Sequence, residues 1–350
     1  MTDINGGENR NLVEVRDLAV SFDTYGGSVK AVRGVSYDIR RAECLAIVGE
    51  SGCGKSVTSQ AIMRLLTTPP AHISGSVKFD GEEVLTLSER KMRELRGSKM
   101  AMIFQDPMTS LNPTMQIGKQ IMEGMRQHQK VSRKEAEARA VEVLRLVRIP
   151  NPESQLKRYP YQLSGGMRQR VVIAMALVCN PALLIADEPT TALDVTTQAQ
   201  ILDLIKGLKN ELNTAVVLIT HDMGVVSNMA ERIAVFYAGK IMEIGGANDV
   251  FYHFAHPYTA ALLRSRPRLD RDRNQKLVSI QGTPPDLFSP PAGCAFAARC
   301  EYAMEICLKK QPEMFAIGRG SEHCACCWLH HPDAAKVYAD FRAEAGGSDE

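Results

Sequence analysis

The chain lacks a long apolar run. A membrane-spanning helix needs roughly 18 consecutive apolar residues, and the longest apolar stretch, residues 171–184, is interrupted by Asn180 and Pro181. The polar start, residues 1–11, has no apolar core of the kind that a signal peptide carries. We therefore expect a protein that does not cross a membrane, so any pore that it serves is formed by other subunits.

An excess of one charge sign is also missing. The formal net charge is +2 over 350 residues, so composition gives no attraction to nucleic acid and we expect no nucleic-acid partner. A hydrophobic content of 45% and a charged content of 23% are ordinary for soluble globular proteins. The length suggests two domains, each large enough for its own core.

A phosphate-binding loop is present between a short apolar run and a helical pattern. Residues 45–48 predict a buried strand, residues 57–66 predict a helix, and residues 49–56 between them fit the pattern G-x-x-x-x-G-K-[ST]. Such a turn directs backbone N–H groups and a helix dipole at phosphate. Lys55 is expected to reach the β- and γ-phosphates and Ser56 to ligate Mg²⁺. The expected nucleotide contacts here are Gly49, Ser51, Gly52, Cys53, Gly54, Lys55, Ser56 and Val57.

A second helix start suited to an anion lies farther along the chain. Ser164 is a natural N-cap before an apolar helical run at residues 167–178. Gly165 and Gly166 have no Cβ in the way of an anion approaching the helix N–H groups. The chain thus has two phosphate-facing helix starts but only one lysine-bearing loop.

Two acids follow a third apolar run, residues 183–186. The carboxyl ends of strands in an open α/β sheet face the ligand. Asp187 is therefore placed to hold Mg²⁺, directly or through water, and Glu188 can polarise the water that attacks the γ-phosphate.

These motifs together resemble the nucleotide-binding subunit of an ABC transporter, over about residues 12–250. The resemblance implies an α/β fold: a P-loop ABC-type nucleotide-binding domain with a RecA-like core and a helical subdomain. It also implies a head-to-tail dimer in which the Ser164 loop of one subunit covers ATP on the Lys55 loop of the other. The residues that carry it are 49–56, Gln105, 163–169, Asp187, Glu188, 192–194 and His221.

The resemblance also assigns roles to single residues. Gln105 resembles the glutamine that senses Mg²⁺ and the γ-phosphate, and His221 resembles the histidine that holds the γ-phosphate and attacking water. The expected catalytic residues are then Lys55, Gln105, Glu188 and His221, and the expected Mg²⁺ ligands are Ser56, Gln105 and Asp187. The residues expected to contact nucleotide across the dimer are Ser164, Gly165, Gly166, Gln169 and Asp194. Tyr25 is the aromatic expected to stack on adenine, with an ordinary surface tyrosine as the alternative.

The segment between the two phosphate-binding regions has a helical texture. Ser132 and Glu135 form a capping-box pattern, followed by apolar residues on one helical face. We expect a helical subdomain at about residues 106–165 within a nucleotide-binding domain of residues 12–255. Residues 256–350 are expected to form a separate C-terminal extension.

Six of the nine cysteines lie after residue 290. Disulfides do not suit a cytosolic chain, whereas thiolates gathered in a loop-rich region suit either an iron–sulfur cluster or Zn²⁺. An unmetallated cysteine-rich loop is the alternative. The six are Cys294, Cys300, Cys307, Cys324, Cys326 and Cys327.

This region narrows the resemblance. The segments 256–259 (HPYT), 282–285 (GTPP) and 293–300 (GCAFAARC) resemble the C-terminal region of oligopeptide and dipeptide importer ATPases. That resemblance implies a [4Fe–4S] cluster on Cys294, Cys300, Cys307 and one late cysteine, for which we favour Cys327. The strongly basic residues 264–276 are expected to be a solvated linker.

The function predicted from these resemblances is ATP hydrolysis that powers oligopeptide or dipeptide import through ATP-driven dimer closure. The alternative is the ATPase of a related importer for nickel, glutathione or opines. Three other classes of ABC ATPase fit this sequence less well. Translation factors carry two cassettes, whereas this chain has one. Assembly ATPases lack the cysteine-rich tail, and repair ATPases have long coiled coils between the two motifs, which are only about a hundred residues apart here. The implied partners are a second, distinct ATPase in a heterodimer, two transmembrane permease subunits and an extracytoplasmic peptide-binding protein. The expected location is peripheral, on the cytoplasmic face of the cell membrane.

Overall fold

The computed structural model describes residues 11–191, 193–265, 280–318 and 322–344. Most of the basic segment 264–276, predicted to be a linker, lies outside these residues. Within them, no helix combines the length and the apolar composition that crossing a bilayer requires.

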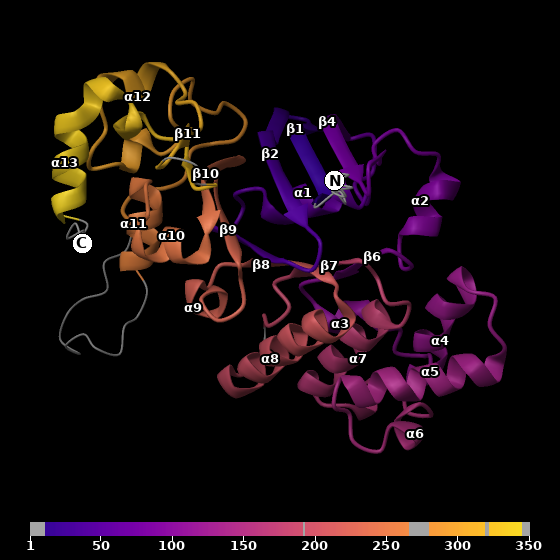
Figure 1. Ribbon diagram of the computed structural model, residues 1–350. Coiled ribbons are helices and arrows are strands. Elements are labelled where there is room, and N and C mark those ends of the chain that lie inside the picture. The colour runs from indigo at the N-terminus through magenta and orange to yellow at the C-terminus, as the bar shows by residue number, and fades with distance from the viewer. Residues whose placement is uncertain (1–10, 192, 266–279, 319–321, 345–350) are drawn as a thin grey trace, which may run out of the picture.

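Two β-sheets organise the chain (Figure 1). The smaller is antiparallel, with the order β2-β1-β4-β5, and is built from β1 (Asn11–Thr24), β2 (Gly27–Arg40), β4 (Ala71–Phe79) and β5 (Glu82–Glu83). The larger has the order β11-β12-β10-β9-β3-β8-β7-β6. Its parallel strands are β3 (Cys44–Val48), β6 (Met100–Ile103), β7 (Leu183–Asp187), β8 (Ala215–Thr220) and β9 (Arg232–Tyr237).

Helices cover one face of the parallel strands, and the antiparallel sheet together with α1 (Lys55–Ile62) covers the other (Figure 1). Side chains alternate across a strand, so Leu184 and Leu218 pack among the helices, whereas Ile185 and Ile219 pack toward β1 and β2. Burial on both faces explains why β3, β7 and β8 are continuous apolar runs.

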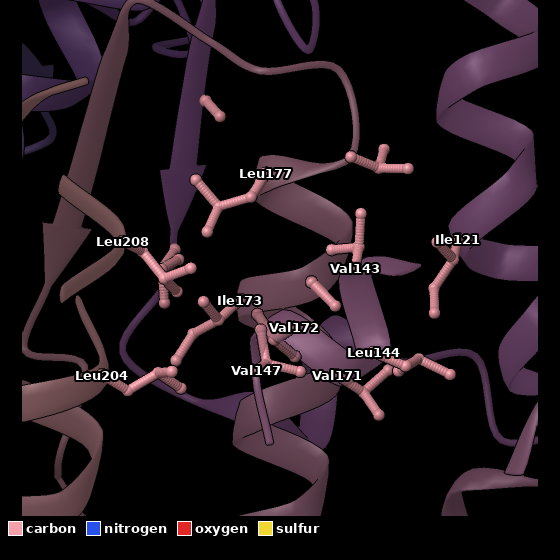
Figure 2. Close-up of a cluster of buried hydrophobic side chains, with 14 of the residues drawn as sticks. Ile121, Val143, Leu144, Val147, Val171, Val172, Ile173, Leu177, Leu204 and Leu208 are labelled. Atoms are coloured by element: carbon pink, nitrogen blue, oxygen red, sulfur yellow. The ribbon is translucent and has the colours of Figure 1, made fainter. Parts of the chain in front are cut away.

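Four α-helices lie between β6 and Ser164 in the described residues, and they pack with the two helices that follow. The four are α3 (Pro107–Ser110), α4 (Ile117–His128), α5 (Arg133–Leu146) and α6 (Pro152–Gln155), and the two that follow are α7 (Gly165–Leu177) and α8 (Val195–Leu212). Figure 2 shows Val143 and Leu144 of α5 meeting Val171 and Val172 of α7. The capping box at α5 is confirmed: Ser132 Oγ accepts from the Glu135 N–H, and Glu135 Oε2 accepts from the Ser132 N–H.

The predicted bounds of the first helix were wrong. α1 is Lys55–Ile62, not 57–66. It begins at Lys55 because Gly54, at a φ of 100°, turns the chain directly into the helix, where its carbonyl accepts from the Thr58 N–H at 2.9 Å. It ends early because Arg64 adopts a left-handed φ of 48°. The N-cap predicted at Ser164 is confirmed: the second phosphate-facing helix begins at Gly165 and ends at Leu177, one residue before the end of the predicted apolar run.

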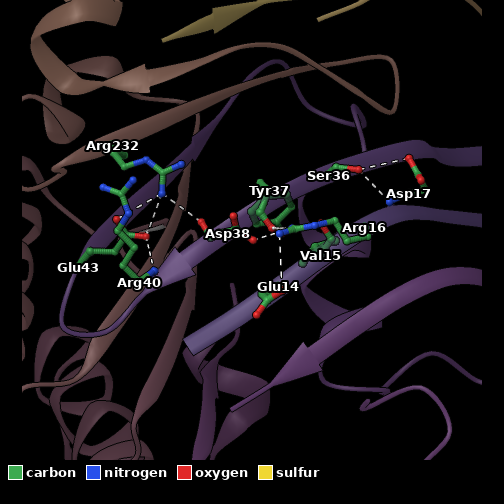
Figure 3. A network of polar contacts seen from close by, with 10 residues as sticks. All are labelled: Glu14, Val15, Arg16, Asp17, Ser36, Tyr37, Asp38, Arg40, Glu43 and Arg232. Carbon is green, nitrogen blue, oxygen red and sulfur yellow. Dashed lines mark hydrogen bonds and ion pairs between the residues drawn. The ribbon is translucent and has the colours of Figure 1, made fainter. Parts of the chain in front are cut away.

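An arginine joins the two sheets through polar contacts (Figure 3). Arg232 of β9 donates to the Asp38 carbonyl of β2 at 3.1 Å and to Glu43 Oε1 at 3.2 Å. The Arg232 and Glu43 side chains are only 12% and 8% exposed. The pair therefore holds the antiparallel sheet against the parallel strands at the edge opposite the strand carboxyl ends.

The C-terminal part extends the larger sheet. β10 (Lys240–Gly246) runs antiparallel to β9, and the short strands β12 (Cys324–Ala325) and β11 (Phe315–Ala316) follow it. Glu243 of β10 is fully buried and accepts from His323 Nε2 at 2.7 Å. The remaining helices are α2 (Glu89–Leu95), α9 (Met223–Val226), α10 (Ala247–Tyr252), α11 (Pro257–Arg264), α12 (Glu305–Lys309) and α13 (Ala335–Glu344).

Candidate functional site

Most of the predicted catalytic residues lie at the carboxyl edge of the parallel strands. The phosphate-binding loop follows β3, Glu188 follows β7, His221 follows β8 and Gln105 lies just beyond β6. These strands are parallel neighbours, so residues far apart in sequence meet at one edge of the sheet.

The phosphate-binding loop requires glycine at its two ends. A Cβ on Gly49 would lie 2.2 Å from the Phe236 carbonyl oxygen, and a Cβ on Gly54 would lie 2.4 Å from the Ala31 carbonyl oxygen. Both glycines also have positive φ, 151° and 100°. The close approach to β2 and β9 therefore sets the shape of the loop as much as its own sequence does.

Replacing Gly54 by alanine is expected to weaken nucleotide binding and lower the melting temperature. The strained backbone alone costs about 1–3 kcal/mol, and the contact with the Ala31 carbonyl adds to it. Thermal unfolding and nucleotide titration measure both effects. Gly81→Ala is the matched control, because Gly81 has a φ of 83° and no atom lies within 4 Å of the position that an alanine Cβ would take. Equal losses of stability in the two variants would contradict the role given to the close approach.

The remaining loop residues differ in exposure. Ser51 and Gly52 are exposed, Cys53 and Lys55 are buried, and Ser56 and Val57 are half-buried. The Lys55 ammonium donates to the Gly49 and Glu50 carbonyl oxygens, both at 2.8 Å.

Two predicted Mg²⁺ ligands lie side by side. Ser56 Oγ donates to Asp187 Oδ1 at 2.8 Å. Burial raises the pKa of Asp187, and the hydrogen bond from Ser56 opposes that rise. A hydroxyl and a buried carboxylate in contact beside Lys55 are the oxygen donors that Mg²⁺ takes in phosphate sites.

Glu188 contacts two of the other predicted catalytic side chains. Its Oε2 accepts from Gln105 Nε2 at 2.9 Å, and its Oε1 lies 3.3 Å from His221 Nδ1. The Glu188 carboxylate is 16% exposed, whereas His221 is 65% exposed. A carboxylate at the rim of the site, with an imidazole and an amide beside it, can orient a water molecule and accept its proton.

Sequence reasoning missed Thr191. Its Oγ1 donates to Glu188 Oε2 at 3.0 Å, and its backbone N–H donates to the Glu188 carbonyl. Glu188 itself has a left-handed φ of 46°, a strained conformation of the kind that clusters at active sites. The only sequence signal was a threonine three positions after an expected base, which is too common to single out.

The second phosphate-facing helix start is present at α7. Ser164 is its N-cap and its Oγ accepts from the Met167 N–H at 3.4 Å. Ser164 and Gly165 are exposed and Gly166 is half-buried. Gln169, by contrast, is 1% exposed and donates to the Pro189 carbonyl at 2.7 Å, so it holds α7 against the segment that follows Glu188.

Asp194 and Tyr25 lie on the surface. Asp194 caps α8, accepting from the Thr197 N–H at 3.0 Å and from Thr197 Oγ1 at 2.7 Å, and these bonds lower its pKa. Tyr25 is fully exposed at the turn between β1 and β2. Ala192, part of the predicted motif 192–194, lies outside the described residues.

Four C-terminal cysteines line one small cavity: Cys294, Cys300, Cys307 and Cys327. Burial raises the pKa of Cys294 to about 11 and that of Cys300 to about 12, and the neighbouring thiols add to both rises. The other two late cysteines are not among its lining residues. In the described part of the chain, no three or more His, Cys, Asp or Glu side chains are arranged so as to hold a metal ion.

Comparisons with known proteins agree with this geometry. Residues 32–191 match the ABC transporter family, and residues 242–307 match the family of the oligopeptide/dipeptide transporter C-terminal region. The oligopeptide transport ATP-binding protein of Bacillus subtilis (strain 168) is 56% identical over 93% of this chain and 91% of its own length. The dipeptide transport ATP-binding protein of the same organism is 54% identical over 91% of this chain and 94% of its own length.

Solved structures share the fold. A dimeric ATP-binding cassette in a post-hydrolysis state with ADP and phosphate has a TM-score of 0.60 and 29% identity, covering 67% of this chain and 98% of that one. The predicted ABC ATPase fold is therefore confirmed. The chain belongs to the ATP-binding proteins of ABC transporters, among those of the oligopeptide and dipeptide systems.

Proposed function

We propose that this chain hydrolyses ATP as one half of a two-subunit clamp, and that closing the clamp powers oligopeptide or dipeptide import. The observation that carries the proposal is the convergence of Gln105 and His221 on Glu188, beside the Ser56–Asp187 pair. Both the family and the match over residues 242–307 support a peptide transporter.

The residues divide the work by position. The N–H groups of the loop and Lys55 bind the phosphates. Ser56 and Asp187 would hold Mg²⁺, which when bound would neutralise phosphate charge. Glu188 accepts a proton from the attacking water, while His221 and Gln105 hold the carboxylate and orient the water toward it.

The second half of each ATP site comes from a partner subunit. Ser164, Gly165 and Gly166 expose a helix N-terminus with no lysine-bearing loop of its own, which suits a phosphate bound to another chain. Gln169 is buried beneath this surface through its bond to the Pro189 carbonyl, and Asp194, exposed at the start of α8, acts across the same dimer interface. We propose that the partner is a distinct ATPase of the same family and that Tyr25 stacks on adenine.

The remaining components are proposed on family grounds. Two permease subunits form the pore, a binding protein outside the cell delivers peptide, and this chain sits peripherally on the cytoplasmic face of the membrane. The test is uptake by vesicles that hold the complete transporter. ATP-dependent accumulation of a labelled peptide is expected, and uptake of nickel without peptide uptake would overturn the substrate class.

We also propose that Cys294, Cys300, Cys307 and Cys327 hold a [4Fe–4S] cluster. Thiolates are the ligands of such clusters, and the four share one cavity. In this structure the four side chains are not arranged as the ligands of a metal group, so the thiols would have to be rearranged around the cluster. When bound, the cluster would supply a cross-link among the loops that carry these residues.

Anaerobically purified protein is expected to contain iron, about four atoms per chain for this cluster type. Cys327→Ser should lose most of it, because Cys327 lines the cavity. Cys324→Ser is the matched control and should retain the iron. Iron, sulfide and zinc analysis measures the outcome, and stoichiometric zinc without iron would contradict the cluster.

A further inference from the structure

An ion pair with a buried arginine joins the C-terminal region to the phosphate-binding loop. Arg299 Nη1 donates to Glu50 Oε2 at 2.8 Å, and Nη2 donates to Glu50 Oε1 at 2.9 Å. Glu50 lies inside the loop, directly after Gly49. The Arg299 side chain is 5% exposed and that of Glu50 is 25% exposed. Two parallel bonds between guanidinium and carboxylate fix both distance and orientation.

The guanidinium is held rigidly from its other side. Its Nε donates to the Gln281 carbonyl at 2.8 Å, Nη2 to the Ile280 carbonyl at 3.1 Å and Nη1 to Tyr237 Oη at 3.1 Å. An arginine has five N–H donors, and with the two bonds to Glu50 each of the five has an acceptor. The guanidinium that bonds Glu50 of the loop therefore has little freedom to move.

Glu50 is also fixed through its backbone. Its N–H donates to Tyr258 Oη at 3.1 Å, from α11. The Tyr258 ring packs against Tyr237 with centroids 4.6 Å apart. Both the side chain and the backbone of this one loop residue are thus held by residues outside the loop.

The same C-terminal region contacts the turn that carries Tyr25. The Leu287 carbonyl accepts from the Lys30 N–H of β2 at 2.9 Å, and Phe288 packs near Gly26. Arg33 of β2 donates to the Pro291 carbonyl at 3.4 Å. This region therefore contacts both the turn that carries Tyr25 and the phosphate-binding loop, the latter through Arg299 and Tyr258.

We infer that Arg299 is a positioning residue for nucleotide binding: through Glu50 it holds the phosphate-binding loop in the shape that accepts phosphate. This rests on ATP binding at that loop. Cys300 follows Arg299 directly, so the order of the cysteine-lined segment can affect the loop through the Arg299 side chain, alongside the bond from the Glu50 N–H to Tyr258. The role assigned to Arg299 is exerted through its two bonds to Glu50.

The test is ATP affinity of the full chain carrying Arg299→Met, measured by titration with a fluorescent ATP analogue. The dissociation constant is expected to rise about tenfold. In the assembled transporter, KM for ATP should rise similarly while kcat stays within about twofold, because the loop is loosened and the base is untouched. An unchanged dissociation constant in folded protein would overturn the inference.

Glu50→Gln tests the pair from the loop side and does not depend on Arg299→Met folding. It should raise the dissociation constant for ATP. Because the two residues act as one unit, the dissociation constant of the double variant should not exceed the higher of the two single-variant values. Fully additive effects would overturn the coupling.

Two further variants separate the explanations. Glu322→Gln breaks another ion pair between this region and the core, Arg40–Glu322, and should leave ATP affinity unchanged. An equal loss of affinity there would mean that general loosening, not Arg299, is responsible. Lys55→Ala should abolish binding. If Lys55→Ala still binds ATP, the ATP site itself is misassigned. If Lys55→Ala fails to bind but Arg299→Met binds normally, only the inference about Arg299 is wrong.

Discussion

Replacing Glu188 by glutamine is expected to leave ATP bound and almost unhydrolysed. The amide keeps the size of the side chain but cannot accept a proton from water, and general-base catalysis is worth about 10²–10⁴-fold. Gln105, Thr191 and His221 all contact this carboxylate. Once it is an amide, these three side chains no longer position a group that can act as the base. Phosphate release should fall by that factor while the dimer retains ATP.

Two measurements are needed together for this variant. Single-turnover phosphate release reports the chemical step, and size-exclusion chromatography with ATP and Mg²⁺ reports the trapped dimer. Glu94→Gln is the control, because Glu94 is an exposed carboxylate on α2, and it should behave as wild type. Normal phosphate release by Glu188→Gln would remove Glu188 from the role of base.

Replacing Ser164 by aspartate is expected to abolish hydrolysis at one ATP site without unfolding α7. Aspartate is as good an N-cap as serine, so the bond from the Met167 N–H can be kept. Its charge, however, would face the γ-phosphate of ATP held by the partner. Loss of one electrostatic contact to a developing charge costs about 10²–10³-fold in rate. Nucleotide binding to the Lys55 loop of the same chain should persist.

The chain offers a close control for this experiment. Ser132 is also a serine N-cap, at the start of α5, and accepts from the Glu135 N–H. Ser132→Asp should therefore leave ATPase activity of the assembled transporter unchanged. Full activity of Ser164→Asp, or rapid hydrolysis by an isolated monomer, would contradict a site shared between two subunits.

Local patterns were enough to predict the elements on which the site is built. The apolar runs of β3 and β7 are buried on both faces, and the capping box at Ser132 is a bond between residues three apart. The bounds of α1 were wrong because they depend on the positive φ of Gly54 before the helix and of Arg64 after it. Local sequence alone does not show that an arginine adopts a left-handed φ.

By itself, the sequence determined the chemistry available to this protein: a lysine-bearing phosphate loop, a capped glycine start to a second helix, and two acids after a buried strand. These are contiguous patterns, and the physics that they depend on acts within a few residues. Only the tertiary structure decided that Thr191 joins Gln105 and His221 on Glu188, and that Arg299 reaches Glu50. Such contacts depend on strand order and on the path of the chain between strands, which periodicity and spacing do not encode.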